Sequence, residues 1–199
     1  MAHESSPIQT LLFLILLAIV GSWSTRAQSR TQEVGAPKRP EIGGDFALTD
    51  QTGGVFRLSD QRGKVVLLFF GYTSCPEACP TMLTKLTGVY KALGTRRDGV
   101  LTAFVSVDPE RDTPAVLGKY MHYFGSNAVG LTGRKEEIDS VVRQYGARYE
   151  IEQSDSVLGY HIRHSTDLYL IGANGKLIRR FSYTDDPALI LAGVEQAIQ

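Results

Sequence analysis

The chain has 199 residues, 43% of them hydrophobic and 21% charged, so it can form one substantial core with room for a tail or an anchor. Its 21 basic and 21 acidic residues balance, which argues against a nucleic-acid-binding surface and against an acidic tail. The two cysteines are too few for a disulfide scaffold, so the core must hold the fold together.

The N-terminal part of the chain differs in composition from the rest. Leu11–Val20 is uninterrupted apolar sequence, which is typical of a signal peptide or of an N-terminal membrane anchor, and we predict one over residues 1–28. Residues 29–41 are polar and contain proline and glycine, which predicts a linker and argues against a buried core helix. The folded domain is therefore expected over residues 42–199.

Beyond the linker, strand-like and helix-like stretches alternate along the chain. In chain order we predict a hairpin over 46–60, a buried strand over 64–72, a helix over 80–94, a strand over 100–108, a helix over 114–125, a short strand over 128–131, a helix over 134–149, two strands joined by a turn over 163–183, and a helix over 186–199. This order predicts a layered α/β domain that begins with a β-hairpin. No glycine-rich phosphate loop follows any of these strands in the sequence, which argues against a nucleotide-binding fold.

Both cysteines, Cys75 and Cys79, lie where the first buried strand gives way to a helix. Reactive groups of α/β proteins lie at such strand ends, and the N–H groups at the start of a helix favour a thiolate. A spacing of four residues brings two sulfurs together over one helical turn, and Pro76 and Pro80 stiffen the loop. Three interpretations compete: a disulfide, a metal site, and two inert core residues. The last is disfavoured in an exported protein, where idle neighbouring thiols would oxidise.

A metal site needs a further ligand, and the chain has four histidines. His3 lies in the leader and His122 lies inside a predicted helix. His161 and His164 are an odd number of residues apart, so on a strand they face opposite sides, and at most one of them points at the thiols. Two thiolates and one imidazole suit Cu(I), and with a weak oxygen donor they tolerate Cu(II). Structural zinc would require four such ligands.

Three stretches together resemble the Sco/SenC family in motif, order and spacing. They are FFGYTSCPEACP (69–80), VSVDPERDTP (105–114) and HSTDLYLIGANGKL (164–177). The resemblance implies a thioredoxin-like fold, with a central mixed sheet flanked by helices. It also implies a copper-binding protein that assists assembly of the copper site of cytochrome c oxidase. Members are typically tethered by an N-terminal apolar segment, with the domain on the outer side of the membrane.

The same resemblance implies roles for individual residues. Cys75, Cys79 and His164 match the copper ligands of the family. Asp108 matches an acidic residue that the family has near the site. We interpret it as a carboxylate that orients the histidine or balances charge, although a turn residue at the end of a strand would have the same local sequence.

Three further residues near these motifs are interpreted separately. Asp112 and Thr113 directly precede a predicted helix, and we interpret both as helix-capping residues. Arg163 departs from the family, which often has an acidic residue at this position. It is expected to alter the local electric field or the surface that meets a partner.

These residues support two main functional hypotheses. In the first, Cys75, Cys79 and His164 hold copper, and the protein is a metallochaperone that passes it to the copper-bearing subunit of cytochrome c oxidase. In the second, the protein is a thiol–disulfide oxidoreductase in which Cys75 attacks, Cys79 resolves, and His164 is not required. A copper or redox sensor would use the same site, so the sequence leaves open whether the protein is an enzyme. A peroxiredoxin-type peroxidase is disfavoured, because Tyr72 stands where that family has Thr or Ser.

The expected partners and location follow from the same hypotheses. Other copper chaperones or thiol reductants would supply the metal or the electrons, and the N-terminal segment would contact the membrane. No nucleic acid is expected as a partner. The sequence lacks an Arg-rich, Ser-rich transit peptide, which favours the periplasmic side of the bacterial inner membrane over the mitochondrial inner membrane.

Overall fold

The computed structural model describes residues 42–125, 127–155 and 159–198. The predicted signal peptide or anchor (1–28) and the predicted linker (29–41) lie outside these residues. Within the described part of the chain, no helix has both the length and the apolar character needed to cross a membrane.

A seven-stranded mixed sheet forms the centre of the domain, with the strand order β2-β1-β5-β4-β3-β8-β9. The strands are β1 (Ala47–Asp50), β2 (Val55–Arg57), β3 (Val65–Gly71), β4 (Val100–Ser106), β5 (Ala128–Thr132), β8 (Leu168–Ile171) and β9 (Leu177–Phe181). β4 runs parallel to both β3 and β5, whereas β1–β2, β1–β5, β3–β8 and β8–β9 pair antiparallel. The predicted α/β class, the mixed sheet and the hairpin at its start are confirmed.

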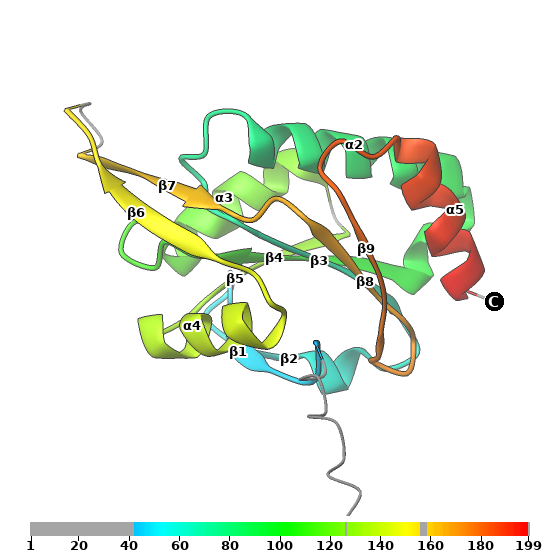
Figure 1. The fold of residues 1–199 in the computed structure, drawn as a ribbon. Coiled ribbons are helices and arrows are strands. Elements are labelled where there is room, and N and C mark those ends of the chain that lie inside the picture. The colour runs from blue at the N-terminus through cyan, green and yellow to red at the C-terminus, as the bar shows by residue number, and fades with distance from the viewer. Residues whose placement is uncertain (1–41, 126, 156–158, 199) are drawn as a thin grey trace, which may run out of the picture. The chain divides into compact units, whose positions relative to one another are not determined.

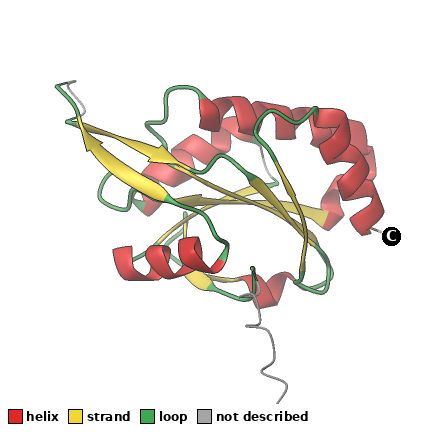
Figure 2. Cartoon of the chain, in the orientation of Figure 1, coloured by secondary structure: helices red, strands yellow, loops and turns green. Residues whose placement is uncertain are grey.

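Helices cover both faces of this sheet (Figures 1 and 2). They are α2 (Ala78–Leu93), α3 (Pro114–Phe124), α4 (Lys135–Gln144), α5 (Pro187–Ile198) and two 3-10 helices, η1 (Leu58–Gln61) and η2 (Gly94–Gly99). Buried residues of α2, α3 and α5 share one hydrophobic cluster, and buried residues of α4 and η1 share the other. The sheet therefore separates two cores.

The strand β3 shows how the sequence builds both cores. All seven of its residues are buried, and successive side chains of a strand point to opposite faces. Val66, Leu68 and Phe70 pack into the core beneath α4, whereas the side chains between them, such as Phe69, pack under α2. A strand buried on both faces accounts for the continuous apolar run in the sequence.

The helix boundaries follow local signals, with one correction. Thr113 caps α3 by accepting a hydrogen bond on Oγ1 from the Val116 N–H, and Pro114 is the first residue of that helix, as predicted. Gly94, with φ of 60°, ends α2 as predicted. The start of α2 was placed too late at Pro80, because α2 begins at Ala78. Proline is tolerated inside the first turn, where the N–H has no intrahelical partner.

A second hairpin was not predicted. β6 (Tyr149–Gln153) and β7 (Tyr160–His164) pair antiparallel as a separate two-stranded sheet. The helix predicted over 134–149 ends earlier, at Gln144, because Gly146 takes a φ of 65° and its N–H turns back to the Arg143 carbonyl. A positive φ of this kind ends helices. Figure 1 shows the β6–β7 hairpin projecting from the body of the domain.

Candidate metal centre

The cysteine pair lies at the carboxyl end of β3. Cys79 is in the first turn of α2 and is completely buried, whereas Cys75 lies in the preceding loop and is half-buried; both are free thiols. Gly71, the last residue of β3, makes room for the deeper sulfur. A Cβ at this position would lie 2.6 Å from the Cys79 Sγ, which is far inside normal contact. The glycine thus lets α2 bring its first turn directly against the end of the strand.

A buried carboxylate fastens the loop that precedes Cys75. Asp112, which is 0% exposed, accepts hydrogen bonds from the Thr73 N–H (2.9 Å), the Thr73 hydroxyl (2.6 Å) and the Ser106 hydroxyl (2.6 Å). The interpretation of Asp112 as a helix-capping residue is therefore wrong, since its oxygens face the cysteine loop and the end of β4. Hydrogen bonds to a charged group are stronger than neutral ones, so this contact holds the loop firmly to the sheet.

His164 approaches the two sulfurs from the end of β7. Its Nε2 lies 3.7 Å from the Cys75 Sγ and 3.5 Å from the Cys79 Sγ. These three ligand atoms all lie within 4.8 Å of one another, the only such group of three found among the described residues. Nδ1 lies 2.9 Å from the Ser165 carbonyl oxygen. Because a carbonyl accepts, Nδ1 carries a proton, and Nε2 is the ring nitrogen that faces the sulfurs.

Aromatic rings hold the imidazole in this orientation. The ring of Tyr72 meets the His164 ring edge-to-face at 5.6 Å, and the ring of Phe69 does so at 6.3 Å. On its outer side the centre opens into a hollow of about 610 Å³, whose lining includes Tyr72, Cys75, Ile162, His164 and Tyr183. The inner side of the site is therefore packed against aromatic rings, and its outer side is accessible through the hollow.

Asp108 contacts residues beside the centre, Tyr160 and Arg111. Its carboxylate, 3% exposed as a residue, accepts a hydrogen bond from the Tyr160 hydroxyl (2.8 Å) and forms an ion pair with Arg111. The orienting contact to His164 comes instead from the Ser165 carbonyl. The two oxygens of Asp108 face Arg111 and Tyr160, so any effect of Asp108 on the orientation of the imidazole would act through these residues and stays a prediction. Its charge-balancing role stays a prediction.

The other histidines lie away from the sulfurs. His161 is on the opposite face of β7 and its Nε2 lies 2.7 Å from Glu152. His122 is an exposed residue of α3, and His3 lies outside the described residues. Arg163 is also on the outer face of the hairpin, where it forms ion pairs with Glu150 and Glu152. The rule that alternate strand residues face opposite sides correctly separated His161 from His164.

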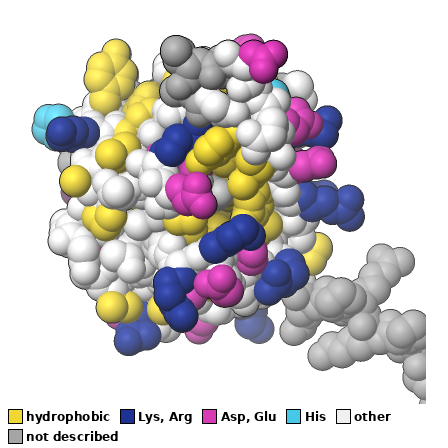
Figure 3. All heavy atoms as spheres, turned by 90° about the vertical axis from the view of Figure 1, so that its left-hand side faces the viewer, with side chains coloured by type: hydrophobic (Ala, Val, Ile, Leu, Met, Phe, Trp, Pro, Cys, Tyr) yellow, Lys and Arg dark blue, Asp and Glu magenta, His cyan; other side chains and the backbone are white. Residues whose placement is uncertain are grey.

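The face from which the hairpin projects has no single sign of charge. Figure 3 shows acidic and basic side chains interspersed around a patch of hydrophobic ones on this side of the domain. This arrangement agrees with the balanced charge of the whole chain, and it does not favour a strongly charged partner.

The two thiols have very different proton affinities. A hydrogen bond from Cys79 is the main reason why the pKa of Cys75 is lowered to about 4, and the contact with His164 acts in the same direction, whereas partial burial opposes it. Burial raises the pKa of Cys79, and the neighbouring Cys75 raises it further. At neutral pH the pair therefore holds one thiolate, at Cys75, and one thiol, at Cys79.

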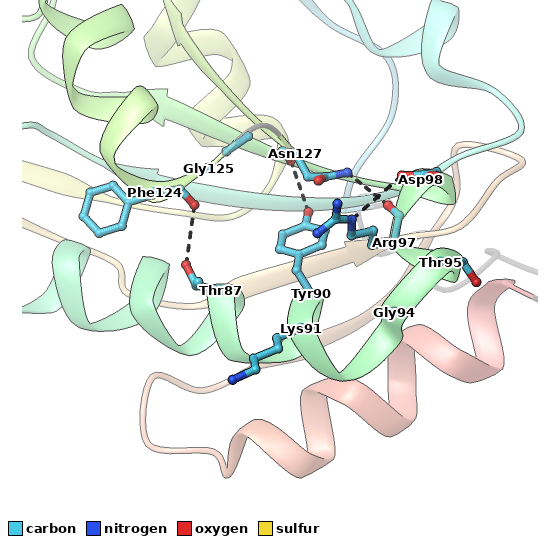
Figure 4. A pocket seen from close by; sticks show the side chains of 11 residues that line it. Thr87, Tyr90, Lys91, Gly94, Thr95, Arg97, Asp98, Phe124, Gly125 and Asn127 are labelled. Atoms are coloured by element: carbon cyan, nitrogen blue, oxygen red, sulfur yellow. Dashed lines mark hydrogen bonds and ion pairs between the residues drawn. The ribbon is translucent and has the colours of Figure 1, made fainter.

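A second hollow of about 600 Å³ lies elsewhere, at the far end of α2 (Figure 4). It surrounds Tyr90, whose hydroxyl bonds the Thr102 hydroxyl at 2.8 Å and the Asn127 carbonyl at 3.2 Å. Its lining includes the basic side chains Lys91 and Arg97 but neither a cysteine nor a histidine. This second hollow therefore lacks the thiol and imidazole groups that line the hollow beside β7.

Sequence reasoning missed several residues around the centre. Tyr160 and Arg111 hold β7 against Asp108, and Ser165 holds the imidazole through its carbonyl. Tyr72 was considered only as an obstacle to peroxidase chemistry, yet it packs on the imidazole and its hydroxyl accepts a hydrogen bond from the Ile162 N–H. Among these residues, only Tyr160 had a signal in the sequence. It stands four positions before His164, and residues two or four positions apart on a strand share a face.

The fold and the centre together define a class of protein. The chain is an α/β protein in which two thiols and one imidazole converge at the carboxyl end of a central strand. Such a donor set can bind a soft metal ion, and its two sulfurs can also exchange with disulfides.

Comparison with known proteins agrees with this class. A model of the SCO1/SenC family matches residues 34–199. An SCO2-like protein of Rickettsia felis is 34% identical over 204 residues, which cover 96% of this chain and 97% of the relative. The structure of Bradyrhizobium japonicum ScoI with copper bound is 36% identical, covers 78% of this chain and 99% of that chain, and has a TM-score of 0.72.

A further solved structure adds a redox property of a relative. BsSco is described as a member of the Sco family of cytochrome c oxidase assembly proteins with a disulfide switch. It is 26% identical, covers 84% of this chain and 98% of that chain, and has a TM-score of 0.61. The chain belongs to the SCO1/SenC family, and the expected thioredoxin-like fold is confirmed.

Proposed function

We propose that this protein is a copper metallochaperone that holds the metal through Cys75, Cys79 and His164. It would pass the copper to the copper-bearing subunit of cytochrome c oxidase. The observation that carries the proposal is the convergence of the three ligand atoms within 4.8 Å. Family membership supports it, since ScoI is a relative with copper bound and BsSco is described among oxidase assembly proteins.

The geometry supports a metal ion shared by all three side chains. Metal bonds of about 2.3 Å to sulfur and 2.0 Å to nitrogen, at angles of about 110–120°, place the nitrogen roughly 3.5–3.7 Å from each sulfur. The distances from Nε2 to the two sulfurs are 3.7 and 3.5 Å. Cys75 is already a thiolate, so the Cys79 proton must leave when copper binds, and Nε2 binds through its lone pair.

The open side of the centre suits a carrier better than a permanent cofactor site. Cys79 and the back of the imidazole are packed, whereas Cys75 and His164 line the hollow. Ligands of an acceptor can approach through this hollow and replace the three side chains one at a time. The copper keeps its charge in such an exchange, so no electron donor is needed.

The proposed location follows from the N-terminal sequence. We propose residues 1–28 as a signal peptide or membrane anchor, residues 29–41 as a linker, and residues 42–199 as a domain on the periplasmic side of a bacterial inner membrane. The match to an SCO2-like protein of Rickettsia felis over 96% of this chain supports a bacterial setting. Fractionation of cells that produce the full chain tests this: recovery in the cytosol would contradict it.

A copper titration tests the ligand set. The full chain, kept reduced in mild detergent, is titrated with Cu(I) against a competing chelator. Wild type should bind one copper per chain, and His164→Ala should bind at least ten times more weakly. The matched control is His161→Ala, which removes an exposed imidazole from the same strand and should bind like wild type. If His164→Ala equals wild type in stoichiometry and affinity, the three-ligand site is wrong.

A second candidate function is thiol–disulfide exchange, favoured by the low pKa of Cys75 and by the disulfide switch described for BsSco. The Cys75 thiolate would attack a disulfide of the oxidase subunit, form a mixed disulfide and release one thiolate of that subunit. Cys79 would lose its proton and attack the Cys75 sulfur, which releases the second thiolate. The subunit gains two electrons, and this protein is left with a Cys75–Cys79 disulfide.

The two functions differ in their need for the imidazole. Exchange with a model disulfide substrate should be nearly as fast in His164→Ala as in wild type, whereas copper affinity should not survive that change. Negligible turnover of disulfides by wild type would remove general oxidoreductase activity and leave the copper role.

A further inference from the structure

The imidazole is carried by a strand that the main sheet does not hold. β6 and β7 form their own two-stranded sheet, and in the described chain neither pairs with the seven-stranded sheet. His164 is the last residue of β7, and β8 begins at Leu168 and enters the main sheet. One end of the segment that carries the imidazole is therefore fixed by backbone pairing. The other end, at Tyr160, needs an attachment of another kind.

Side chains of the β4–α3 loop supply that attachment. The Tyr160 hydroxyl donates a hydrogen bond to Asp108 Oδ1 (2.8 Å). The main-chain carbonyl of Tyr160 accepts a hydrogen bond from Arg111 Nη1 (3.1 Å). The Arg111 guanidinium lies 3.8 Å from the centre of the Tyr160 ring and pairs with the other oxygen of Asp108. Tyr160 is thus held at its ring, its hydroxyl and its main chain.

The attachment is on the same face of β7 as the imidazole. Tyr160, Ile162 and His164 alternate along the strand, so their side chains point towards the body of the domain. Ile162 is 4% exposed, and its N–H donates to the Tyr72 hydroxyl (3.3 Å). Four residues of strand place Tyr160 about 13 Å from His164, so a tilt of β7 at the Tyr160 end moves the imidazole relative to the sulfurs.

We propose that Tyr160 is a positioning residue that presents His164 to the two sulfurs, acting through Asp108 and Arg111. The inference rests on the proposed copper function. It goes beyond the ligand set, because it states that binding of copper by the imidazole depends on the Tyr160 hydroxyl, which is not itself a ligand. It also gives Asp108 a specific task, which is to hold the strand that carries the imidazole.

The test is a double-mutant cycle of Tyr160→Phe and His164→Ala, measured as Cu(I) affinity of the full reduced chain in mild detergent. Tyr160→Phe keeps the ring, its stacking on Arg111 and the main-chain contact, and removes only the hydroxyl. We expect it to lower Cu(I) affinity about ten-fold when His164 is present, and less than two-fold when His164 is alanine. A matched control is Tyr90→Phe, which removes a partly buried hydroxyl at the far end of α2, where one of its two hydrogen bonds has the same length, 2.8 Å.

Nitrogen NMR of labelled histidine gives a second readout that a general loss of stability would not move. On Cu(I) binding, the Nε2 signal of His164 should shift fully in wild type and in Tyr90→Phe, but only partly in Tyr160→Phe. The inference is overturned if Tyr160→Phe matches wild type, or if it weakens copper equally with and without His164. If His164→Ala itself matches wild type, the proposed ligand set fails, and the positioning role fails with it.

Discussion

The cysteine loop and the β6–β7 hairpin provide the two halves of the candidate metal centre, and they are built in opposite ways. The loop joins β3, in the middle of the sheet, to the buried first turn of α2. The hairpin stands outside the sheet and is attached through side chains such as Tyr160 and through the tyrosine hydroxyl that bonds Ile162. The thiols are therefore positioned by the main sheet and α2. The imidazole is positioned by a separate hairpin, which is held through polar contacts and through the packing of Ile162 and aromatic rings.

This difference has a consequence for a metal carrier. A rigid pair of thiols keeps one part of the donor set constant, whereas an imidazole on a separate element can be displaced at small free-energy cost. The free energy needed to open a region locally falls with the number of buried contacts that hold it. Changes in the loop should therefore affect the whole domain, and changes in the hairpin should affect the imidazole alone.

The largest effect is expected from Asp112→Ala. It leaves the Thr73 N–H, the Thr73 hydroxyl and the Ser106 hydroxyl without their shared acceptor, and we expect it to lower the free energy of unfolding by about 4 kcal/mol. Urea denaturation measures this loss. Asp98→Ala is the control, because the Asp98 side chain is 85% exposed and should change stability by less than about 0.5 kcal/mol. A loss at Asp112 no larger than at Asp98 would contradict the contrast between loop and hairpin.

A smaller loss of stability is expected from Gly71→Ala. The added Cβ would lie 2.6 Å from the Cys79 Sγ and 2.7 Å from the Phe104 ring, and relief of such overpacking costs about 2 kcal/mol. Thermal or urea unfolding checks it. Gly88→Ala is a matched control within α2, because a Cβ there meets nothing within 4 Å. That change should instead stabilise the protein by about 0.8 kcal/mol.

The hairpin should respond locally to Tyr149→Phe. The Tyr149 hydroxyl donates to Asp139 Oδ1 at 2.5 Å and attaches β6 to α4. Its loss should lower the free energy of opening the hairpin by about 1 kcal/mol, which speeds amide hydrogen exchange in β6 and β7 about five-fold. The hydrogen-exchange rates of β3 amides, measured in the same experiment, should change only as far as the global free energy of unfolding changes. Equal acceleration in β3 would mean that the two regions open as one unit.

The smallest effect on stability is expected from pH, because Cys75 is half-buried and its interactions are screened by water. Folding lowers the pKa of Cys75 from an unperturbed 9.0 to about 4. Between these values the unfolded chain binds one proton more, so the contribution of Cys75 to stability grows as pH rises from 4 towards 9 and is lost as pH falls through 4. Cys79, with its raised pKa, opposes this only at higher pH.

Urea denaturation of the reduced, metal-free chain at pH 5 and pH 8 measures that contribution. Wild type should gain more stability between these values than Cys75→Ser, because the serine hydroxyl does not titrate in this range. A gain of the same size in both proteins would show that Cys75 is not a thiolate in the folded chain.

Much of the fold followed from local patterns. The apolar run of β3, the Thr113 cap of α3 and the turn at Gly53 are each set by neighbouring residues, and the structure has all three. The β6–β7 hairpin was not predicted although its strands, YEIEQ and YHIRH, alternate apolar and polar residues, because each has only five residues and most of their side chains are at least partly exposed. A half-exposed two-stranded sheet gives a weak hydrophobic signal.

The roles of Asp112 and Tyr160 could not be predicted for a different reason. Asp112 bonds Thr73, 39 positions away, and Tyr160 bonds Asp108, 52 positions away. The residues next to Asp112 do not show whether it caps the following helix or accepts hydrogen bonds in the core, because an aspartate in either role can stand just before a helix. Only the packing of β4 beside β3 brings its oxygens to the cysteine loop.

By itself, the sequence determined that two thiols share one strand-to-helix junction, because four residues of chain span at most about 14 Å even when fully extended. It also determined that His161 and His164 point in opposite directions, because strand side chains alternate. The tertiary structure alone decided which imidazole meets the sulfurs and from which side. That approach spans 85 positions from Cys79, and it depends on how a separate hairpin is attached to the sheet rather than on any local preference of the chain.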